Sequence, residues 1–360
     1  MAQTTRARRL PPEIFDLPAE KMREGYYTDA YFNHARAALL ADGRHPRVVM
    51  QVFQKHRAVL GGIDEAIAIL KLGSDDWEEL TVHALYDGDR AGPWETVMTI
   101  EGDYTLFAHL ETAYLGVLSR RTLISTNVTR VLEAANGKPI IFMAARHDHH
   151  RVQTGDGYAA FVAGAMIGVE IGVTSDAQAS WWGGRGIGTV PHSLIASYGG
   201  NTVLAATKFA EWAPEDFRIV VLVDFENDSV RTALEVARAL GPRLWGVRLD
   251  TSSQLVDRAL WGELGDFDPR GVNERLVRKV RDALDGDGFE RVKIVCSGGF
   301  TVGRIAEFER NGVPVDSYGV GSSLIRGEND FTADIVMADG RPAAKVGRRF
   351  RPNERMELVE

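Results

Sequence analysis

The sequence is poor in cysteine, because Cys296 is the only one among 360 residues. A single thiol forms no intramolecular disulfide and cannot build a cysteine-based zinc cage. Cys296 ends a short apolar run with no general base evident beside it, so we expect a small buried strand residue rather than a nucleophile. A chain without disulfides suits a reducing compartment, and the expected location is the cytoplasm.

Positive charge is also scarce, since 42 Lys and Arg residues face 50 Asp and Glu residues and leave a net charge of -8. This balance argues against a nucleic-acid coat, and the basic run at 6–9 is too short to change that expectation. No apolar run approaches the roughly 20 residues of a membrane span, and the N-terminus has no apolar signal-peptide segment. We therefore expect a soluble protein with neither nucleic-acid nor membrane partners.

The chain does contain ample apolar sequence, 44% of its residues, and 37 glycines, as in a globular enzyme with many tight loops. Strand patterns dominate residues 47–101, and helical spacing occurs at 29–40 and 62–71. The strands are expected at 48–53, 79–85 and 96–100, and the tail has strand character at 335–337 and 344–346. These patterns predict a smaller α+β domain at 1–110, which the tail at 335–360 joins.

Short apolar runs then alternate with amphipathic helices, after a long helical stretch at 104–136. The runs lie at 139–143, 218–223, 244–247, 292–296 and 313–318, and the helices at 157–167, 229–240, 271–284 and 302–309. Such runs are typical of parallel strands covered on both faces, and the alternation predicts a parallel sheet closed into a β/α barrel. The second predicted domain, 111–334, contains the helical link and this α/β barrel.

Two of the apolar runs lead directly into polar loops rich in glycine. The residues are Ser297, Gly298 and Gly299 after the first run, and Gly319, Gly321 and Ser322 after the second. Glycines let backbone N–H groups approach an anion closely, and serine hydroxyls add donors. In a β/α barrel the loops after the last two strands are the usual phosphate site. The sequence therefore predicts a phosphorylated ligand.

Charged residues recur at the corresponding ends of the other runs. They are Arg146 with the cluster 147–151, Asp224 with Glu226, and Arg248 with Asp250. Because barrel enzymes place catalysis at the carboxyl ends of their strands, we expect one shared site. Acidic groups there can hold Mg²⁺ or ribose hydroxyls, and arginines can bind phosphate or carboxylate. The histidines at 147–150 are too close in sequence to converge on one ion, which disfavours a metal site.

The segment 181–193 is the most unusual local sequence. It has glycines at GxGxG spacing, but it lacks both a preceding strand and the Lys-Ser/Thr pair of a P-loop. His192 precedes a helical stretch at 194–197, where it can contact an anion or simply be hydrogen-bonded in a packed loop. The spacing leaves both interpretations of His192 open. The pair Trp181-Trp182 has no assigned role. The aromatic residues at 26–32 suit a core, although an aromatic near a polar site can also stack on a flat ring.

Taken together, these segments resemble the nicotinate phosphoribosyltransferase family, in its archaeal-like branch. The matching segments are 28–32, 100–102 with 109–112, 188–192, 247–251, 297–299 and 316–321. The resemblance implies an irregular β/α barrel with an open sandwich domain, in a homodimer with active sites at the interface. It implies transfer of 5-phosphoribosyl from 5-phosphoribosyl 1-pyrophosphate (PRPP) to nicotinate, giving nicotinate mononucleotide and pyrophosphate in NAD biosynthesis.

The resemblance also implies residues for the nicotinate site. Tyr31 matches a tyrosine of the neighbouring subunit that stacks on the pyridine ring, and Arg146 suits the nicotinate carboxylate. Thr189 belongs to the same substrate site. His192 matches the histidine that some family members phosphorylate with ATP, which makes ATP a possible co-substrate.

The remaining implied roles concern the ribose donor. Arg248 and Asp250 match the catalytic pair at the base and ribose, and the two glycine loops match the cradle of the 5-phosphate. Asp224 joins the PRPP site, and Asp224 and Asp250 are the candidate ligands of Mg²⁺. A carboxylate such as Asp250 can stabilise the positive charge that develops on ribose when pyrophosphate leaves.

Two other functions stay open at this point. Quinolinate phosphoribosyltransferase shares the fold, although its Arg-Lys-Thr segment is absent and the motif around His192 favours nicotinate. A non-catalytic phosphate or nucleotide sensor on the same scaffold is the other alternative. The presence of Arg248, Asp250 and Asp224 together with both glycine loops argues against it, because a sensor need not keep transition-state groups. One departure from the family is that the chain reads Asp250-Thr251-Ser252 where many relatives read Asp-Ser-Gly-Asp.

Overall fold

The computed structural model describes residues 9–263, 265 and 267–360, and these form two compact units. Unit 1 holds the chain up to Thr126 together with Arg326–Glu360, and unit 2 is Asn127–Ile325. The boundary falls inside the long helix α4 (Glu111–Ala134). Three of the four residues in the basic run at 6–9 lie outside the described residues. Within the described ranges, no helix is both long and apolar enough to cross a bilayer.

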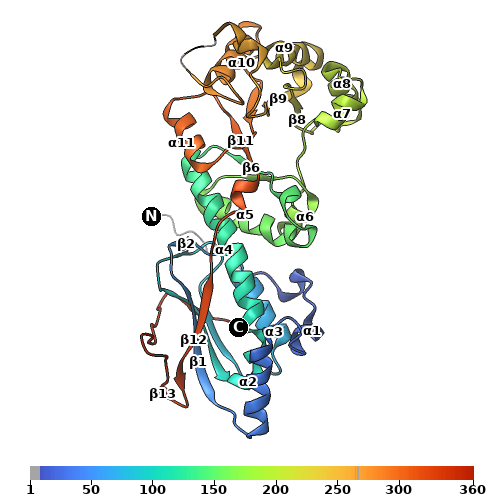
Figure 1. Cartoon of the computed structure of the whole chain (residues 1–360). Helices are drawn as coiled ribbons and strands as arrows, with labels where there is room; N and C mark the ends of the chain where they lie inside the picture. Colours follow the sequence, from blue (N-terminus) through green and yellow to red (C-terminus); the bar gives the residue numbers. More distant parts are fainter. Residues whose placement is uncertain (1–8, 264, 266) are drawn as a thin grey trace. The chain divides into compact units, whose positions relative to one another are not determined.

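Unit 1 is built on a six-stranded antiparallel sheet in which the N-terminal and C-terminal segments meet (Figure 1). In spatial order the strands are β13 (Arg341–Pro342), β12 (Phe331–Ala338), β1 (Arg47–Gln54), β5 (Thr96–Asp103), β3 (Thr81–Ala84) and β14 (Glu357–Leu358). The C-terminal strand β12 pairs with β1 from Val48 opposite Ala338 to Gln54 opposite Phe331. This confirms the predicted α+β domain made from both ends of the chain.

Alternation along β1 separates the two faces of this sheet. Met50 and Val52 belong to the core cluster that includes the buried residues of α3 (Ile63–Gly73). Gln51 and Phe53 alternate with them and are buried on the opposite face. The other elements of unit 1 are η1 (Pro12–Phe15), α1 (Ala19–Arg23), α2 (Ala30–Ala41), β2 (Ala58–Val59), β4 (Arg90–Ala91), η2 (Tyr104–Leu106) and η3 (Ala108–Leu110).

Unit 2 contains a six-stranded sheet in which all strands are parallel. Their order is β7 (Ile171–Val173), β6 (Ile140–Phe142), β11 (Ser317–Val320), β10 (Lys293–Cys296), β9 (Leu244–Leu249) and β8 (Ile219–Leu222). Cys296 is fully buried in β10, as expected, and burial raises the pKa of its thiol.

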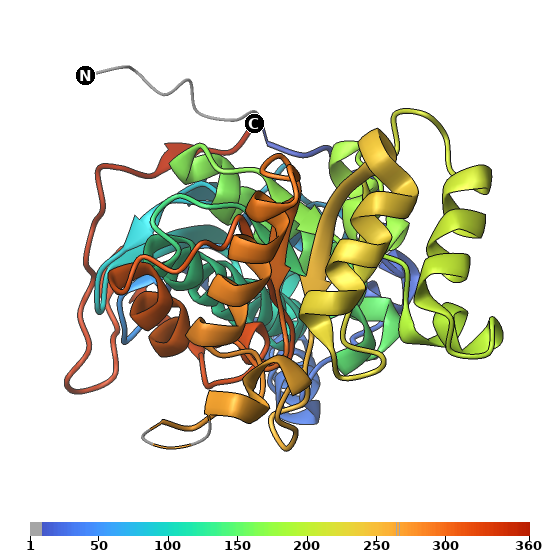
Figure 2. The ribbon, with the colours of Figure 1, turned by 90° about the horizontal axis from the view of Figure 1, so that it is seen from above.

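Helices connect these strands, and α9 packs against β9 (Figure 2). They are α5 (Gln153–Ile167), α6 (Asp176–Ala179), α7 (His192–Ser197), α8 (Thr202–Trp212), α9 (Ser229–Leu240), α10 (Glu274–Gly286) and α11 (Val302–Arg310). The 3-10 turns are η4 (Ala145–His147), η5 (His150–Val152), η6 (Ser180–Trp182), η7 (Gly241–Arg243), η8 (Arg258–Glu263) and η9 (Ser322–Leu324). The Trp181-Trp182 pair lies in η6, where the Trp182 ring stacks on Phe161 of α5 with the ring centres 4.7 Å apart.

An irregular segment links the two edge strands of unit 2. The Ile187 N–H donates to the Val173 carbonyl beside β7 (2.7 Å), and the Val190 N–H donates to Val220 of β8 (2.8 Å). At Gly172 of β7, an added Cβ would lie 2.5 Å from the end of the Ile187 side chain, which would have to move to make room. The sheet is thus a half-barrel whose open side is spanned by single hydrogen bonds. The predicted irregular β/α barrel is confirmed.

Three expected elements differ most from the observed ones. The helical stretch at 104–136 begins as the turns η2 and η3 and becomes α-helical only at Glu111. Residues 344–346 form no strand. The run at 313–318 is paired only from Ser317, because Pro314 has no N–H and the Asp316 carboxylate accepts the Ile294 N–H bond (2.8 Å). At its other end β11 continues to Val320, so Gly319 lies inside the strand and not in the loop after it.

Candidate active site

The parallel sheet of unit 2 brings the carboxyl ends of its strands to one edge. Five polar segments that the sequence singled out lie there: Arg146 after β6, Asp224 after β8, Arg248 and Asp250 at the end of β9, Ser297–Gly299 after β10, and Gly321 and Ser322 after β11. The Val190 bridge to Val221 adds His192 to this edge. Residues from across unit 2 therefore share one site because the strands are parallel.

Arg248, Asp250 and Ser297 form the centre of the site. The Arg248 Nη2 donates to Asp250 Oδ2 (3.0 Å), and Nε donates to Ser297 Oγ (2.7 Å). The Ser297 hydroxyl reaches Asp250 Oδ1 (2.8 Å), and a longer contact joins Arg248 Nη1 to Thr189 Oγ1 (3.4 Å). Because Cys296 pairs with Leu249, the β9–β10 register places Ser297 next to Asp250.

The ion pair of Arg248 and Asp250 is largely shielded from water, with side chains 17% and 23% exposed. Arg248, as a guanidinium, stays charged at any physiological pH, which sustains the ion pair. Its opposite charges nearly cancel at long range and act only on groups in contact. Such a pair can stabilise charge that develops close by without attracting bulk ions.

His192 and Asp224 form a second polar pair. The His192 Nε2 lies 3.0 Å from Asp224 Oδ1, and the Asp224 side chain is only 7% exposed, whereas His192 is 44% exposed. This hydrogen bond raises the pKa of His192, with burial and Arg248 opposing the rise. His192 begins α7, so the helix and the Val190 bridge hold its backbone. A carboxylate that orients one imidazole nitrogen and leaves the other free is typical of an activated histidine.

The hydrogen bond between His192 and Asp224 should make the free energy of unfolding depend on pH. A raised folded pKa means that the stabilisation by protonated His192 is complete below the unfolded value of about 6.5. It is lost as the pH rises through the folded pKa. Denaturant unfolding of wild type and His192→Gln between pH 5 and 9 should therefore show a stability difference that is largest at the acidic end. A difference that grows towards high pH would contradict the pairing.

The loop after β10 has the geometry of an anion cradle. Gly298 and Gly299 both have positive φ (87° and 82°), which few residues other than glycine adopt. The loop enters α11, whose N-cap is Thr301, so unpaired backbone N–H groups lie at its start. The Ser323 hydroxyl donates to the Phe300 carbonyl (3.0 Å), which ties the loop after β11 to the loop after β10. These two loops therefore form one cradle.

Two glycines beside this cradle have packing reasons of their own. A Cβ at Gly319 would lie 2.8 Å from Met143 Sδ and 3.1 Å from Ser297 Cβ. A Cβ at Gly321 would lie 2.9 Å from His147 Nε2. Both positions leave room for side chains that follow β6, and at Gly319 the contact with Ser297 Cβ gives the glycine a packing reason that involves no ligand.

Arg146 lies in η4 and is exposed, and it forms no ion pair with a carboxylate of the described residues. An uncommitted guanidinium at the end of β6 suits a ligand carboxylate. The neighbouring histidines at 147–150 are exposed too, and the rings of His149 and His150 lie 4.2 Å apart. Over residues 9–263, 265 and 267–360, no three His, Cys, Asp or Glu side chains are grouped as a metal site would need.

Asp224 and Asp250 were the expected Mg²⁺ ligands, and their present partners decide how well they fit. Both oxygens of Asp250 accept hydrogen bonds, from Arg248 and Ser297. Asp224 has one oxygen bonded to His192, which leaves the other without a hydrogen bond from the described residues. Mg²⁺ commonly takes one or two carboxylates and completes its shell with substrate phosphates and water. The donors fit an ion that arrives with a phosphorylated substrate, with Asp224 as the available ligand.

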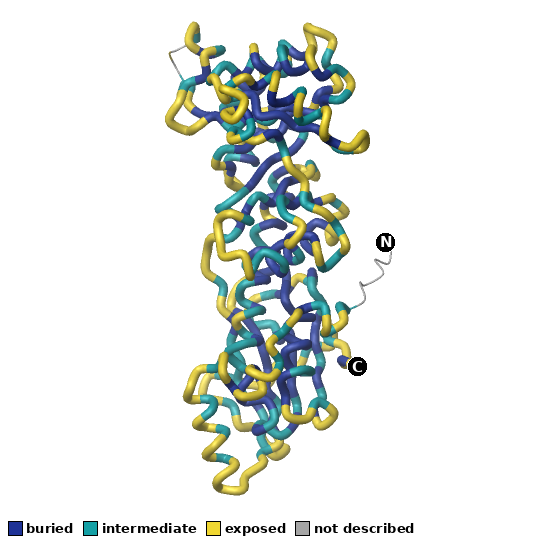
Figure 3. Tube along the Cα trace, turned by 90° about the vertical axis from the view of Figure 1, so that its right-hand side faces the viewer, coloured by how far each residue is buried: buried dark blue, intermediate teal, exposed yellow. Residues whose placement is uncertain are grey.

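Tyr31 belongs to unit 1, where α2 has no buried residue (Figure 3). Its ring is 62% exposed, and its hydroxyl donates to Asp29 Oδ2 (3.3 Å). Thr112 of α4 holds Asp29 in place, because its hydroxyl donates to the same carboxylate oxygen (3.1 Å) and accepts the Asp29 N–H (3.0 Å). An oriented, exposed aromatic ring can stack on a flat ligand or on a partner protein.

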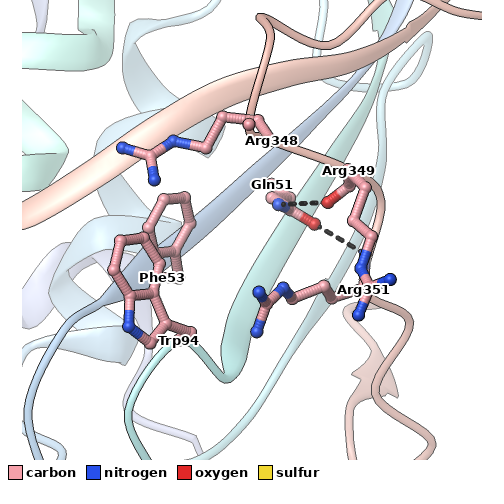
Figure 4. A pocket seen from close by; sticks show the side chains of 7 residues that line it. Gln51, Phe53, Trp94, Arg348, Arg349 and Arg351 are labelled. Atoms are coloured by element: carbon pink, nitrogen blue, oxygen red, sulfur yellow. Dashed lines mark hydrogen bonds between the residues drawn. The ribbon is translucent and has the colours of Figure 1, made fainter.

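Unit 1 also has a small pocket that the sequence did not reveal (Figure 4). Buried Gln51 donates to the Arg349 carbonyl (3.1 Å) and accepts the Arg351 N–H (3.0 Å), so it holds the tail against β1. The Arg348 guanidinium lies over the stacked rings of Phe53 and Trp94, and Arg351 also reaches Trp94. Arg348 Nε is 2.9 Å from an Asp334 oxygen, close enough for an ion pair but poorly aligned for a hydrogen bond. The arginines make the pocket positively charged.

The chain matches the family model described as quinolinate phosphoribosyl transferase, N-terminal domain, over residues 29–122. A nicotinate phosphoribosyltransferase of Mycobacterium tuberculosis is 30% identical over 91% of this chain and 78% of its own length. The human nicotinate phosphoribosyltransferase is 28% identical over 69% of this chain and 53% of its own. The alignment with the Mycobacterium protein therefore includes most of both units of this chain.

Solved structures agree on the fold. A nicotinate-nucleotide pyrophosphorylase from Pyrococcus furiosus superposes with a TM-score of 0.79 and 30% identity, over 100% of this chain and 86% of that one. Human nicotinic acid phosphoribosyltransferase superposes with a TM-score of 0.60 over 88% of this chain and 76% of that one, and at 18% identity this shows the fold alone.

Proposed function

The chain belongs to the nicotinate phosphoribosyltransferase family, and we propose that it transfers 5-phosphoribosyl from PRPP to the ring nitrogen of nicotinate. The observation that carries this proposal is the shielded Arg248–Asp250 pair beside the glycine cradle after β10. A phosphate in that cradle would leave the sugar of the same ligand near the Asp250 carboxylate. The products are nicotinate mononucleotide and pyrophosphate.

Charge development explains the choice of residues. When the bond between ribose C1 and pyrophosphate breaks, positive charge builds on C1 and the ring oxygen, and the bond from the pyridine nitrogen forms. Asp250 stabilises this charge, and Arg248 holds the carboxylate in position. The pyridine nitrogen already carries a lone pair, so no general base is needed. This fits a site with carboxylates and arginines but without a nucleophile–base pair at the sugar.

Pyrophosphate carries several negative charges as it leaves. Mg²⁺ bound with PRPP would neutralise part of that charge. Asp224 would support such an ion through the oxygen that accepts no hydrogen bond from the described residues, while both oxygens of Asp250 are bonded to Arg248 and Ser297. Removing divalent ions with EDTA should abolish turnover, and adding Mg²⁺ back should restore it. Full activity in EDTA would contradict this part of the proposal.

Arg146 is proposed to bind the nicotinate carboxylate, because it is exposed at the end of β6 and has no acidic partner in the part of the chain that the structure describes. Arg146→Gln should raise the KM for nicotinate about tenfold or more, the cost of one lost charge-assisted hydrogen bond. The KM for PRPP should change little. The matched control is Arg151→Gln, in the next exposed turn, which should leave both constants near wild type. Equal effects of the two substitutions would assign the loss to general surface charge.

His192 is proposed to accept a phosphoryl group from ATP, at the imidazole nitrogen that Asp224 leaves free. Intact-mass measurement after incubation with ATP and Mg²⁺ should show one added phosphoryl group in wild type and none in His192→Ala. Turnover that is unchanged by ATP, with no added mass, would remove ATP from the reaction.

The proposed activity is tested by offering alternative bases. The protein is incubated with PRPP and Mg²⁺ and either nicotinate, nicotinamide or quinolinate, with and without ATP, and products are separated by chromatography. Nicotinate mononucleotide from nicotinate is the expected result. Carbon dioxide release with product only from quinolinate would support the decarboxylating alternative, and no product from any base would favour a phosphate sensor.

A further inference from the structure

Ser297 is the most constrained side chain at the centre of the site. It is 2% exposed at the end of β10, and its backbone N–H donates to the Leu249 carbonyl (2.9 Å). Its hydroxyl lies 2.7 Å from Arg248 Nε, 2.8 Å from Asp250 Oδ1 and 3.1 Å from the Leu249 carbonyl. The glycine-loop pattern had assigned this hydroxyl to a ligand phosphate.

The capacity of a hydroxyl decides between these assignments. A serine Oγ has one proton to donate and two lone pairs. Arg248 Nε can only donate, so it must occupy a lone pair of Ser297. The carboxylate of Asp250 and the carbonyl of Leu249 can only accept, so they share the single proton. Ser297 therefore has no proton left for a phosphate oxygen.

The contacts place the hydroxyl inside the ion pair. Arg248 and Asp250 could meet through two parallel hydrogen bonds, which is the usual fork geometry of an arginine and a carboxylate. Here one arm is direct, from Nη2 to Oδ2, and in the other arm Ser297 Oγ stands between Nε and Oδ1. The serine thus keeps the guanidinium and the carboxylate from closing into a direct two-bond pair.

Packing holds the serine in this place. A Cβ on Gly319 of the neighbouring strand β11 would lie 3.1 Å from Ser297 Cβ, and a Cβ on Gly298 would lie 3.5 Å from Asp250 Oδ1. The two glycines leave room for the serine and its partners. Packing at the ends of β9, β10 and β11 therefore fixes this arrangement.

From these contacts we infer that Ser297 is a positioning residue: it orients Asp250 and Arg248 for the transfer step and does not bind the phosphate. The inference rests on the proposed function for its catalytic consequence. Without the hydroxyl, Arg248 and Asp250 close into a direct pair, and the carboxylate turns away from the sugar. The cradle of Gly298 and Gly299 is unaffected, because its donors are backbone groups.

The test compares Ser297→Ala with Ser322→Ala, which removes a hydroxyl from the loop after β11. Ser297→Ala should lower kcat about tenfold to 100-fold, as expected for a disturbed electrostatic group, with the KM for PRPP within about twofold of wild type. Ser322→Ala should instead raise the KM for PRPP while kcat changes little. A raised KM for PRPP with unchanged kcat in Ser297→Ala would overturn the inference, and circular dichroism with thermal unfolding verifies that each variant is folded.

Two measurements do not depend on turnover. The affinity for inorganic phosphate, measured by calorimetry, should be unchanged in Ser297→Ala and reduced in Ser322→Ala. An equal loss of affinity in Ser297→Ala would show that Ser297 binds the phosphate. The ¹⁵N–¹H resonance of Arg248 Nε, identified by its absence in Arg248→Lys, should move in Ser297→Ala and stay in place in Ser322→Ala. An unmoved resonance would refute the positioning contact. If no base is turned over, the proposed function fails, while these two readouts still decide the role of Ser297.

Discussion

Asp250→Asn is expected to lower kcat about 100-fold to 1000-fold while changing the KM for PRPP less than about threefold. The carboxylate is needed when positive charge develops on the ribose in the transition state. It is not needed for PRPP binding, because the ribose ring of PRPP is uncharged. Removing its charge therefore raises the energy of the transition state more than that of the bound substrate. Steady-state kinetics with nicotinate and PRPP measure both constants.

Asparagine is a sharp probe at this position because it has the same shape as aspartate. Its amide oxygen can still accept from Arg248 while the NH₂ group faces Ser297, whose hydroxyl can accept from it and donate to the Leu249 carbonyl, so the substitution mainly removes the charge. A matched control is Asp268→Asn, which breaks the exposed ion pair with Arg270 and should leave the kinetics unchanged. If kcat and PRPP affinity fell together, Asp250 would be mainly a binding residue.

The composition of the site was largely predictable, because it follows from local sequence. Arg248 and Asp250 are two residues apart at a strand end, which puts them on the same side of the strand. The glycines at 298 and 299 adopt positive φ, as loops that bind anions require. Strands read as apolar runs predicted a parallel sheet, and in such a sheet these loops must gather at one edge.

The contacts within the site were not predictable, because they depend on the register between strands. Ser297 meets Asp250 only because Cys296 pairs with Leu249, and neither residue type nor spacing encodes that pairing. His192 and Asp224 are 32 residues apart and meet through one bridge at Val190. The spacing had left His192 between two readings, and the bond to Asp224 shows a hydrogen-bonded histidine that still has one free nitrogen.

The pairing of β11 also explains where the sequence-based prediction was wrong in unit 2. The strand β11 begins four residues later than its apolar run, because Pro314 and the side chain of Asp316 occupy the expected pairing positions. At the other end of this strand, the glycine pattern assigned Gly319 to a phosphate loop, although pairing with β6 continues to Val320 and places it within the strand. In unit 1 the pocket at Arg348 joins residues about 300 positions apart in sequence, from β1 to the tail. No local pattern connects such segments before the sheet forms.

Tyr31→Ala and Asp250→Asn, each nearly inactive alone, are expected to recover about a quarter of wild-type activity when mixed and allowed to exchange subunits. The expectation follows from the homodimer that the family resemblance implies, in which Tyr31 of one subunit stacks on nicotinate bound beside Asp250 of the other. Half of randomly formed dimers are mixed, and each mixed dimer has one intact site and one site with both defects. The exposed ring of Tyr31, on a helix without buried residues, makes it available to a partner.

The design separates a shared site from one formed within a single chain. If Tyr31 and Asp250 served the same chain's site, every site in a mixed dimer would carry one defect and mixing would recover no activity. Mixing Tyr31→Ala with the Tyr31→Ala/Asp250→Asn double variant is the control, since it can form no intact site under either arrangement. The mass of the complex from light scattering must also correspond to a dimer, because a monomer would rule out sharing whatever the activity. Recovery in the first mixture and none in the control would place Tyr31 in the partner's active site.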